Sequence, residues 1–124
     1  MKKYNRNKGK FGENMAKLFL EKKNYKLVEA NFFMRDGEID LIMTDNDFLV
    51  FVEVKLKIGE TFGSPEEMIN RAKIAFIRKT AQMFLLENPK LANIYKRQRI
   101  DVVCIKLNQD KSIDRINHYQ NVDL

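Results

Sequence analysis

The sequence predicts one α/β domain in which a central mixed β-sheet is flanked by two helices, in the order helix, three strands, helix, two strands. Two segments, one near the N-terminus and one after residue 64, have apolar residues at helical spacing. Three runs rich in β-branched and aromatic residues lie between them, and two more follow the second helical segment. Short polar turns join antiparallel strands, whereas a helix between two strands favours a parallel crossover, so the sheet is expected to be mixed.

The first helix is predicted over residues 11–23, where apolar side chains recur at helical spacing and charged residues, mostly lysines, fill much of the remainder. Asn24 follows as a residue suited to a left-handed helix stop. Residues 25–34 are predicted to form a strand, and Asp36-Gly37 is a typical two-residue hairpin signal before the next one. Asp45-Asn46-Asp47 is turn chemistry between two apolar runs, so the first three strands are expected to form an antiparallel meander.

The second helix is predicted to open at Ser64-Pro65-Glu66-Glu67, which combines an N-cap serine, a proline at the first helical position and a glutamate placed for a capping box. It is expected to end at Asn88-Pro89. Its core-facing stripe is predicted to contain Met68, Ala72, Ala75, Phe76, Met83 and Leu86. Residues 57–63 contain two glycines and are expected to form the preceding loop. Two strands, over 100–107 and 113–119, complete the predicted sheet.

Composition limits the class of protein. A chain of 124 residues with 44% apolar residues is long enough for one domain with a substantial core and too short for two. No apolar run approaches the length of a membrane span, and the first residues lack the pattern of a signal peptide, so a cytoplasmic location is expected. The single cysteine, Cys104, lies in an apolar run and is expected to be a buried thiol in a reducing compartment. The single histidine, His118, has no evident partner in the sequence and is interpreted as structural.

The net charge of +6 is concentrated at the N-terminus, because residues 1–10 carry five basic side chains and no acidic one. The rest of the chain is therefore close to neutral, at about +1. Residues 1–10 also lack apolar periodicity, so a flexible basic tail is predicted there, followed by a single domain over residues 11–124. Such a tail would either contact phosphate groups or remain a solvated segment, and the sequence leaves both alternatives open.

Three charged residues interrupt the strands of the predicted meander: Asp40 in one strand, and Glu53 and Lys55 in the next. Alternation along a strand places Phe51, Glu53 and Lys55 on one face and Val50, Val52 and Val54 on the other. Because the two strands are expected to pair as a hairpin, Asp40 is predicted to face Glu53 across the pair.

Two facing carboxylates repel each other, so a stable sheet retains them only where something neutralises them. A divalent cation would do so, and hard oxygen ligands select magnesium or manganese. With Lys55 beside them, the acids suit phosphodiester hydrolysis, in which the metal polarises the phosphate and the lysine stabilises developing charge. Spacing alone leaves an alternative open, namely an ordinary cross-strand network of ion pairs on a solvated face.

These residues resemble the PD-(D/E)XK, or restriction-endonuclease-like, nuclease superfamily, whose core motif is an Asp, a spacer and Glu-x-Lys. More narrowly, the sequence resembles the YraN-like family of small bacterial proteins, which are predicted endonucleases related to Holliday-junction resolvases. The matching stretches, which cover nearly the whole chain in order, are Gly12-Glu13 with Ala16, Gly37-Glu38-Ile39-Asp40-Leu41-Ile42, Val50-Phe51-Val52-Glu53-Val54-Lys55, Lys73, and Arg99-Ile100-Asp101-Val102-Val103. The resemblance implies a three-layer, restriction-endonuclease-like fold.

The resemblance also implies site residues. Asp40 and Glu53 would be ligands of Mg²⁺ or Mn²⁺, the Val54 carbonyl would add a third oxygen, and Lys55 would be the catalytic lysine. Glu13, which taken alone is a partner of the helix dipole, would approach the metal from the first helix. Glu38 lies on the same strand face as Asp40 and is a candidate supporting group.

Five basic residues are predicted to contact nucleic acid: Lys57, Arg71, Lys73, Arg78 and Arg99. Their alternative role on the second helix is a solvated charged face. The sequence departs from the family at Lys57, where an arginine is frequent, and at Ile100, where a phenylalanine is frequent. The first change replaces a planar fork by a point charge.

The function expected from the sequence is metal-dependent cleavage of DNA, including branched or otherwise structured DNA, with a homodimer as one option. Two alternatives of other classes remain: a nucleic-acid-binding module that keeps the fold without cutting, and a structural or partner-binding protein whose acids form ion pairs.

Overall fold

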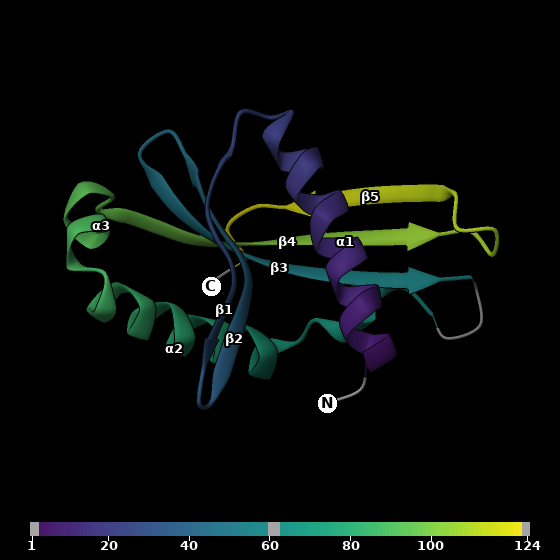
Figure 1. Cartoon of the computed structure of the whole chain (residues 1–124), viewed down its shortest axis with the longest axis horizontal. Helices are drawn as coiled ribbons and strands as arrows, with labels where there is room; N and C mark the ends of the chain where they lie inside the picture. Colours follow the sequence, from purple (N-terminus) through teal and green to yellow (C-terminus); the bar gives the residue numbers. More distant parts are fainter. Residues whose placement is uncertain (1–2, 60–62, 123–124) are drawn as a thin grey trace.

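The computed structural model describes residues 3–59 and 63–122 and has the predicted α/β order (Figure 1). The predicted sequence of one helix, three strands, a helix and two strands is confirmed, with two short helical segments added. The elements are α1 Lys3–Glu21, β1 Lys26–Met34, β2 Gly37–Asp45, β3 Phe48–Ile58, the 3₁₀ helix η1 Pro65–Met68, α2 Arg71–Glu87, α3 Pro89–Ile94, β4 Arg97–Leu107 and β5 Ile113–Tyr119.

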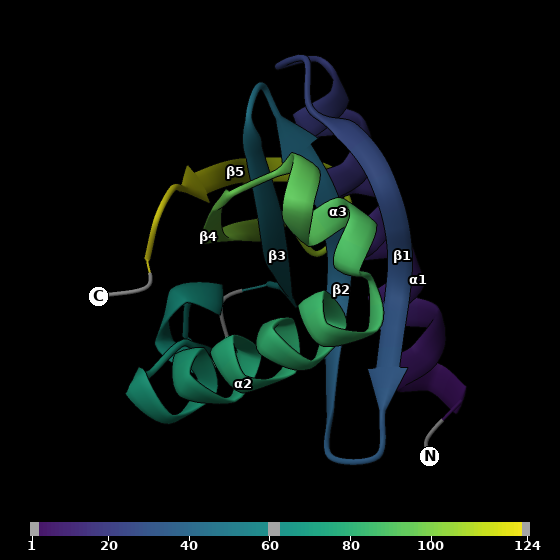
Figure 2. The ribbon, with the colours of Figure 1, turned by 90° about the vertical axis from the view of Figure 1, so that its left-hand side faces the viewer.

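The five strands form one mixed sheet in the order β1-β2-β3-β4-β5. β3 and β4 pair in parallel along their whole length, and the other neighbours are antiparallel. Both the meander and the parallel crossover through α2 are therefore as predicted. Figure 2 shows β1 and β2 running steeply across the direction of β4 and β5, so the sheet is strongly twisted.

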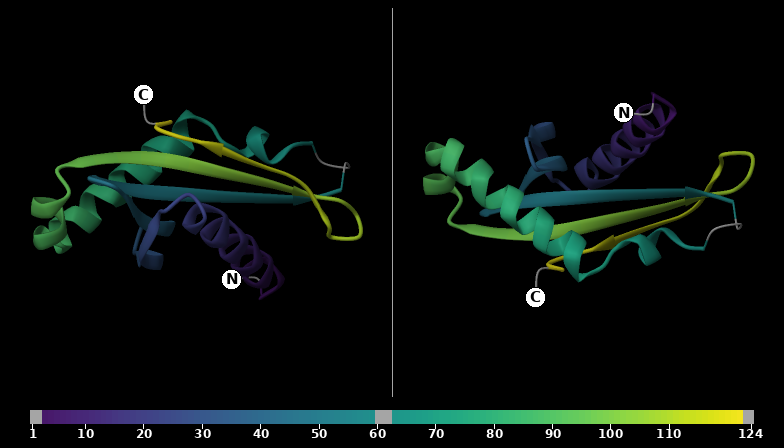
Figure 3. Two further views of the ribbon diagram at one scale, coloured as in Figure 1. Left: turned by 90° about the horizontal axis from the view of Figure 1, so that it is seen from above. Right: turned by 90° about the horizontal axis from the view of Figure 1, so that it is seen from below.

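The sheet lies between α1 on one face and α2 with α3 on the other (Figure 3). Because side chains alternate along β3, this strand contributes to the packing on both faces of the sheet. Val50 and Val52 pack in the cluster that contains Ala16 of α1, whereas Phe51 packs in the cluster that contains the α2 side chains. The expected division of the β3 faces is thus confirmed, and it leaves Glu53 on the α2 side.

α1 begins earlier than the sequence indicated. It starts at Lys3 rather than at residue 11, so residues 3–10 of the expected tail are helical, while residues 1–2 lie outside the described part of the chain. Lysine and arginine are good helix formers, and extending a helix that packing has already nucleated is easy. The helix ends as predicted, because Asn24 adopts a left-handed backbone with φ of 72°. No helix in the described residues is long and apolar enough to cross a membrane.

The predicted second helix is divided in two. Ser64 and Pro65 open only the short η1, and Ile69 returns to an extended backbone with φ of −98° and ψ of 123°. α2 has its own N-cap at Asn70, whose side chain accepts a hydrogen bond from the Lys73 backbone N–H at 2.8 Å. The expected loop 57–63 is also shorter, because β3 continues to residue 58, and residues 60–62 lie outside the described residues.

The predicted core stripe of α2 was wrong. The buried face carries Ile74, Ile77, Thr80, Ala81 and Phe84. By contrast, four of the larger apolar residues expected in the core are exposed: Met68, Phe76, Met83 and Leu86. The helix contains two apolar stripes at helical spacing, and the cap at residue 70 together with the shape of the sheet decides which one is buried.

The first hairpin turn is shifted by one residue from its predicted position. Met34 pairs with Gly37, so the two loop residues are Arg35 and Asp36, and Gly37 already belongs to β2. The glycine serves close packing instead, because a Cβ atom at Gly37 would overlap the Thr80 hydroxyl of α2. The second hairpin turns at Asn46 and Asp47 as expected, and Asn46 has φ of 55°.

Candidate active site

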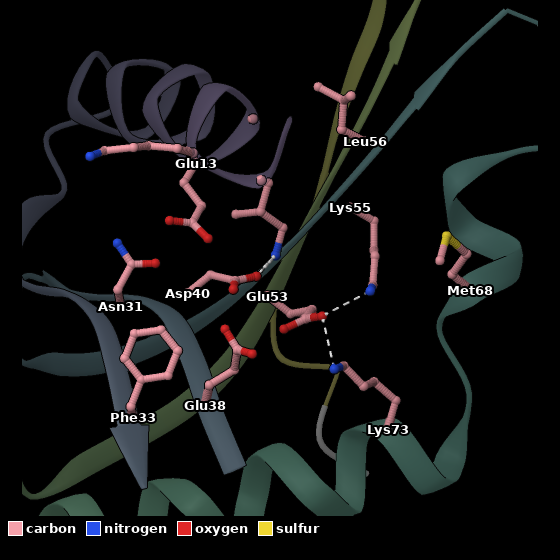
Figure 4. A pocket seen from close by; sticks show the side chains of 14 residues that line it. Glu13, Asn31, Phe33, Glu38, Asp40, Glu53, Lys55, Leu56, Met68 and Lys73 are labelled. Atoms are coloured by element: carbon pink, nitrogen blue, oxygen red, sulfur yellow. Dashed lines mark hydrogen bonds and ion pairs between the residues drawn. The ribbon is translucent and has the colours of Figure 1, made fainter. Parts of the chain in front are cut away.

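An open pocket of about 830 Å³ lies at the end of the β2–β3 ladder, with walls from α1, β1, η1 and α2. The four residues that the sequence nominated for catalysis all line it, although they come from three different elements (Figure 4). They are Glu13 of α1, Asp40 of β2, and Glu53 and Lys55 of β3. Lys73, Glu38 and Lys10 line the same pocket. The structure therefore brings the predicted constellation together and adds a basic rim.

Asp40 is fixed by the backbone of the neighbouring strand. The β2–β3 ladder runs from the pair of Asp45 with Phe48 to the pair of Leu41 with Val52. Immediately beyond it, Oδ2 of Asp40 accepts a hydrogen bond from the Val54 N–H at 2.8 Å. A side-chain oxygen thus pairs with a β3 amide where the ladder has ended, which orients a carboxylate that is only 9% exposed.

Glu53 is held by two lysines. Nζ of Lys55 lies 3.5 Å from Oε2 of Glu53, and Nζ of Lys73 lies 3.4 Å from the same oxygen. Lys55 comes from the same face of β3, whereas Lys73 comes from the first turn of α2, which Asn70 caps. Because Glu53 is 3% exposed, these ion pairs offset much of the unfavourable burial of its charge.

Glu13 enters the pocket because α1 packs closely on β3 at Gly12. A Cβ atom at Gly12 would lie 3.3 Å from Cδ1 of Leu56, which leaves little room for any larger residue. Burial raises the pKa of Glu13, and the charges of Glu38 and Glu53 add to this, while hydrogen bonds with Asp40 and Asn31 oppose it. The Glu13 carboxyl group points toward that of Asp40, as Figure 4 shows.

The pKa of Asp40 lies well above its usual value. Burial is the main cause, followed by the charge of Glu53, while the Val54 N–H opposes the shift and the charges of Glu13 and Glu38 enhance it. The pocket thus concentrates carboxyl groups beyond what its lysines compensate. Strongly perturbed acids in an open cleft are typical of functional sites, although structural networks also perturb pKa values.

The donor chemistry of the pocket fits a hard divalent cation. Carboxylate oxygens of Asp40, Glu53 and Glu13 and the backbone carbonyl of Val54 are ligands that magnesium and manganese prefer. Within residues 3–59 and 63–122, no three such side chains already stand together as a preformed cage. Both lysines contact Oε2 of Glu53, so a cation bound to this carboxylate would share it with them or displace them.

The remaining basic residues predicted to contact nucleic acid lie outside the pocket lining. Lys57 follows Lys55 on the same face of β3 and is half-buried. On α2, Arg71 is exposed two residues before the pocket residue Lys73 in the sequence, and Arg78 is half-buried. Of the five residues predicted, only Lys73 is brought to the site.

Arg99, which the sequence placed among the nucleic-acid contacts, lies away from the pocket in a buried network of ion pairs. Its Nη2 lies 2.7 Å from Oδ2 of Asp45 and its Nε lies 3.0 Å from Oδ1 of Asp101, with the side chain 8% exposed. Although burial opposes it, these partners raise the pKa of Arg99. The structure does not bring Arg99 to the pocket, and a buried, doubly paired guanidinium is poorly placed to contact a phosphate. The predicted strand started at residue 100, but β4 already begins at Arg97, and Arg99 points inward from it.

His118 belongs to the same buried network and does have partners. Its Nε2 lies 2.8 Å from Oδ2 of Asp101, and its Nδ1 lies 3.0 Å from Nζ of Lys23. Burial raises the pKa of Asp101, but hydrogen bonds from His118 and Arg99 have the larger opposite effect. The pKa of Asp101 therefore lies below its usual value. Tyr25 donates to the same carboxylate at 3.1 Å. The network joins β4, β5 and the start of β1, and none of its members lines the pocket.

Sequence reasoning missed two neutral residues of the pocket, Asn31 and Phe33 of β1. Asn31 has φ of 55°, a left-handed backbone that asparagine tolerates, and its side chain bonds Glu13. Phe33 is 65% exposed, with its ring in the pocket wall (Figure 4). The only indication of Asn31 in the sequence was that an asparagine interrupts a predicted strand.

Comparison with known proteins gives a consistent assignment. The family described as "Uncharacterised protein family UPF0102" matches residues 12–105, which contain every residue predicted for catalysis. A UPF0102 protein of Syntrophomonas wolfei is 41% identical over 117 residues, covering 94% of this chain and 97% of the relative. UPF0102 proteins of Carboxydothermus hydrogenoformans and Clostridium tetani are 36% and 40% identical, covering 92% and 91% of this chain and 92% and 93% of the relatives.

Proposed function

This chain belongs to the UPF0102 family, the same family as the YraN-like proteins, and from its geometry we propose that it is a metal-dependent endonuclease that hydrolyses phosphodiester bonds in DNA. One observation carries the proposal: Glu13, Asp40, Glu53 and Lys55 meet in one open pocket although they come from α1, β2 and β3. The raised pKa of Glu13 and of Asp40, together with the buried Glu53 and its lysines, suits chemistry on a phosphate that a cation also contacts.

The relation to the restriction-endonuclease-like superfamily is part of the proposal. It is supported by the order of helices and strands and by the placement of Asp40 and of Glu53 with Lys55 on neighbouring strands. DNA that is branched or otherwise structured is the substrate expected from this relation, and a cytoplasmic location and a homodimer belong to the same expectation.

In the proposed site, Asp40, Glu53 and the Val54 carbonyl would hold Mg²⁺ or Mn²⁺, with Glu13 as a further ligand from α1. The bound ion would polarise the phosphate and lower the pKa of the attacking water. The Val54 N–H holds the Asp40 carboxylate in a fixed orientation. Lys55 and Lys73, released from Glu53, would donate hydrogen bonds to the phosphate oxygens and stabilise the charge that develops there.

The charge balance of the pocket argues for catalysis over simple binding. Four carboxyl groups, those of Glu13, Glu38, Asp40 and Glu53, line the space that a phosphate would enter. A module that only bound nucleic acid would gain little from acids that repel the phosphate backbone. A cation removes this repulsion, and the lysines at residues 10, 55 and 73 then favour phosphate entry.

A structural role is favoured by one specific observation, the pairing of both Lys55 and Lys73 with Glu53. If that were their whole function, the ion pairs would persist with any solute present. Asp40 and Glu13 would then be acids that are merely tolerated at the edge of the sheet.

One experiment separates the three functions. Linear duplex, single-stranded and four-way-junction DNAs are incubated with the protein in Mg²⁺ or Mn²⁺, with Asp40→Ala and Glu53→Ala as variants and Asp36→Ala, on the exposed hairpin turn, as the control. Cleavage that both site variants lose, with binding retained, supports the nuclease. Binding without cleavage by the intact protein supports the binding module. Neither cleavage nor binding supports the structural role.

Metal binding can be tested without DNA. A ligand of the native state raises the thermal midpoint of unfolding in proportion to the logarithm of its concentration. We expect millimolar Mn²⁺ to raise the midpoint of the intact protein and to leave that of Asp40→Ala unchanged. An unchanged midpoint for the intact protein would refute the metal site.

A further inference from the structure

We propose that Phe33 and Glu38 form a subsite that receives one unpaired nucleobase next to the reacting phosphate. The inference rests on the proposed nuclease function and names the class of substrate that this pocket would take. It uses two pocket residues that the proposed function assigns neither as ligands of the cation nor as contacts of the phosphate.

The two residues are direct neighbours across β1 and β2. Phe33 pairs with Glu38 in the antiparallel ladder, so their side chains lie on one face of the sheet with Cβ atoms about 5 Å apart. Both line the pocket, and both are exposed. Figure 4 shows the Phe33 ring and the Glu38 carboxylate side by side below Asp40.

The exposure of Phe33 is imposed by the strand itself. Phe32 occupies the opposite face of β1, where it is buried with its ring centroid 5.0 Å from that of Phe84. Alternation therefore turns Phe33 away from the core and into the pocket, where the aromatic ring remains 65% exposed. A large apolar face left open beside charged groups is suited to a flat, partly apolar ligand.

An unpaired base is the flat group that a nucleic acid offers. Stacking on an aromatic side chain needs a free face, and a base inside a duplex shares both faces with its neighbours. Glu38 precedes Asp40 by two residues on β2, which is about 7 Å along the strand. A base on Phe33 and the phosphate near Asp40 would thus belong to the same or to adjacent nucleotides.

Glu38 gives the subsite a preference among bases. An ionised carboxylate repels phosphate and accepts hydrogen bonds, so it favours a base that presents amino groups on its pairing edge. Guanine, adenine and cytosine carry such amino groups, whereas thymine does not. The subsite should therefore take an unpaired base with an amino group in preference to unpaired thymine.

The test measures base stacking directly. Duplexes that carry one unpaired 2-aminopurine, one unpaired guanine or one unpaired thymine are compared with a fully paired duplex, in EDTA so that binding is read without cleavage. The variants are Phe33→Leu, Phe33→Tyr and Glu38→Gln, and Phe76→Leu, an exposed phenylalanine of α2 outside the pocket, is the matched control. Because Phe33 is exposed, Phe33→Leu should keep the thermal midpoint of the intact protein.

We expect binding to quench the aminopurine fluorescence and Phe33→Leu to abolish the quenching. The same variant should raise the Kd for the aminopurine and guanine duplexes by about 5- to 100-fold, as expected for the loss of one stacked base, while the fully paired duplex is unaffected. Phe33→Tyr and Phe76→Leu should retain intact binding. Glu38→Gln should reduce the preference for guanine over thymine.

Equal weakening of bulged and fully paired duplexes by Phe33→Leu would overturn the subsite, and so would quenching that persists in that variant. Cleavage assays in Mg²⁺ on the same duplexes keep this result separate from the proposed function. If the intact protein cuts DNA without regard to unpaired bases, the nuclease stands and the subsite fails. If the base stacks on Phe33 but no metal supports cleavage, the nuclease fails and the stacking stands. No binding in either EDTA or Mg²⁺ refutes both.

Discussion

Nζ of Lys73 on α2 lies 3.4 Å from Oε2 of Glu53 on β3. An ion pair therefore joins the helix to the central sheet inside the pocket. Lys55 occupies the other side of the same oxygen at 3.5 Å. In the metal-free protein these lysines neutralise the group that the cation would bind. In the proposed site, metal and lysine would therefore compete for Glu53, and this competition would have opposite consequences for metal affinity and for DNA affinity.

Lys73→Gln should bind Mn²⁺ more tightly and DNA more weakly than the intact protein. Removing a competing ion pair that is worth about 0.5–1 kcal/mol should strengthen Mn²⁺ binding by about two- to fivefold. Losing a phosphate contact should weaken DNA binding and slow cleavage at least about tenfold. Calorimetric titration with Mn²⁺ and a cleavage assay measure the two effects. Lys79→Gln, an exposed lysine of the same helix, should change neither, and a Lys73 variant with unchanged Mn²⁺ affinity would contradict the competition.

Asp40→Asn should be more stable than the intact protein at neutral pH when no metal is present. The variant keeps an oxygen that can accept the Val54 N–H but removes a charge that burial and Glu53 disfavour. Because burial and the charge of Glu53 raise the pKa of Asp40 well above its usual value, removing the charge should increase the free energy of unfolding. Urea unfolding measures it. The same variant should lose the stabilisation by Mn²⁺, and a loss of stability in the metal-free state would show that the Asp40 charge is favourable.

The stability of the metal-free protein should fall as pH rises from about 4 toward neutrality. Asp40 and Glu13 have a raised pKa in the folded state, so in this range the native protein binds more protons than the unfolded chain. A carboxyl with a raised folded pKa is most favourable below its unfolded value and loses that contribution as pH passes through the folded value.

Glu66 and Asp101 act in the opposite sense at lower pH. Hydrogen bonds from Arg115 lower the pKa of Glu66 to about 2, and partners also hold that of Asp101 low, so their contribution is lost only as pH falls below about 4. Urea unfolding across pH should therefore give a maximum in the acidic range, and Asp40→Asn should flatten the neutral side. Saturating Mg²⁺ should weaken or reverse the neutral slope, because metal and protons compete. If Asp40→Asn left the pH dependence of the metal-free stability unchanged, the titrating group would be a residue other than Asp40.

The strand arrangement and three of the site residues could be predicted from the sequence because both follow from local rules. A period of two in β3 fixes which side Glu53 and Lys55 share, and the turn at Asn46 fixes their hairpin partner. The position of Glu13 could not be derived this way, since only its resemblance to a family motif pointed to the site. Its approach depends on the close contact of Gly12 with β3, which is a tertiary feature.

The buried face of α2 and the role of Phe33 could not be predicted for related reasons. α2 carries a second apolar stripe, including Phe76 and Met83, that satisfies the same periodicity as the buried one, so the pattern alone does not choose between them. Phe33 follows the equally apolar Phe32, and alternation shows only that one of the two is turned away from the core. Which one faces a pocket is decided by α2, because Phe84 covers Phe32.

Gly37→Ala should destabilise the protein even though Gly37 has no left-handed backbone. The added methyl group would overlap the Thr80 hydroxyl, so α2 would be pushed away from β2, with an expected loss of about 1–3 kcal/mol. Asp40 and Lys73 lie on these two elements, so cleavage should fall as well. The double variant with Thr80→Ala, which removes the obstructing atoms, should recover most of the stability. If the double variant is no more stable than the sum of the single effects predicts, the contact is not the cause.

Arg99 and Arg71 were both predicted to contact nucleic acid, and the variants Arg99→Met and Arg71→Met should differ in their effects on stability and on DNA binding. Arg99→Met leaves Asp45 and Asp101 without their guanidinium, and breaking a buried ion pair from one side is expected to reduce stability by about 3–5 kcal/mol. The folded fraction should still bind DNA as tightly as the intact protein. Arg71 is exposed at the start of α2, so Arg71→Met should change stability by less than about 0.5 kcal/mol, and as a phosphate contact of the proposed interface its loss should weaken DNA binding with a reduced salt dependence. Urea unfolding and DNA titrations at several salt concentrations measure both effects, and weaker DNA binding by folded Arg99→Met would return that residue to the interface.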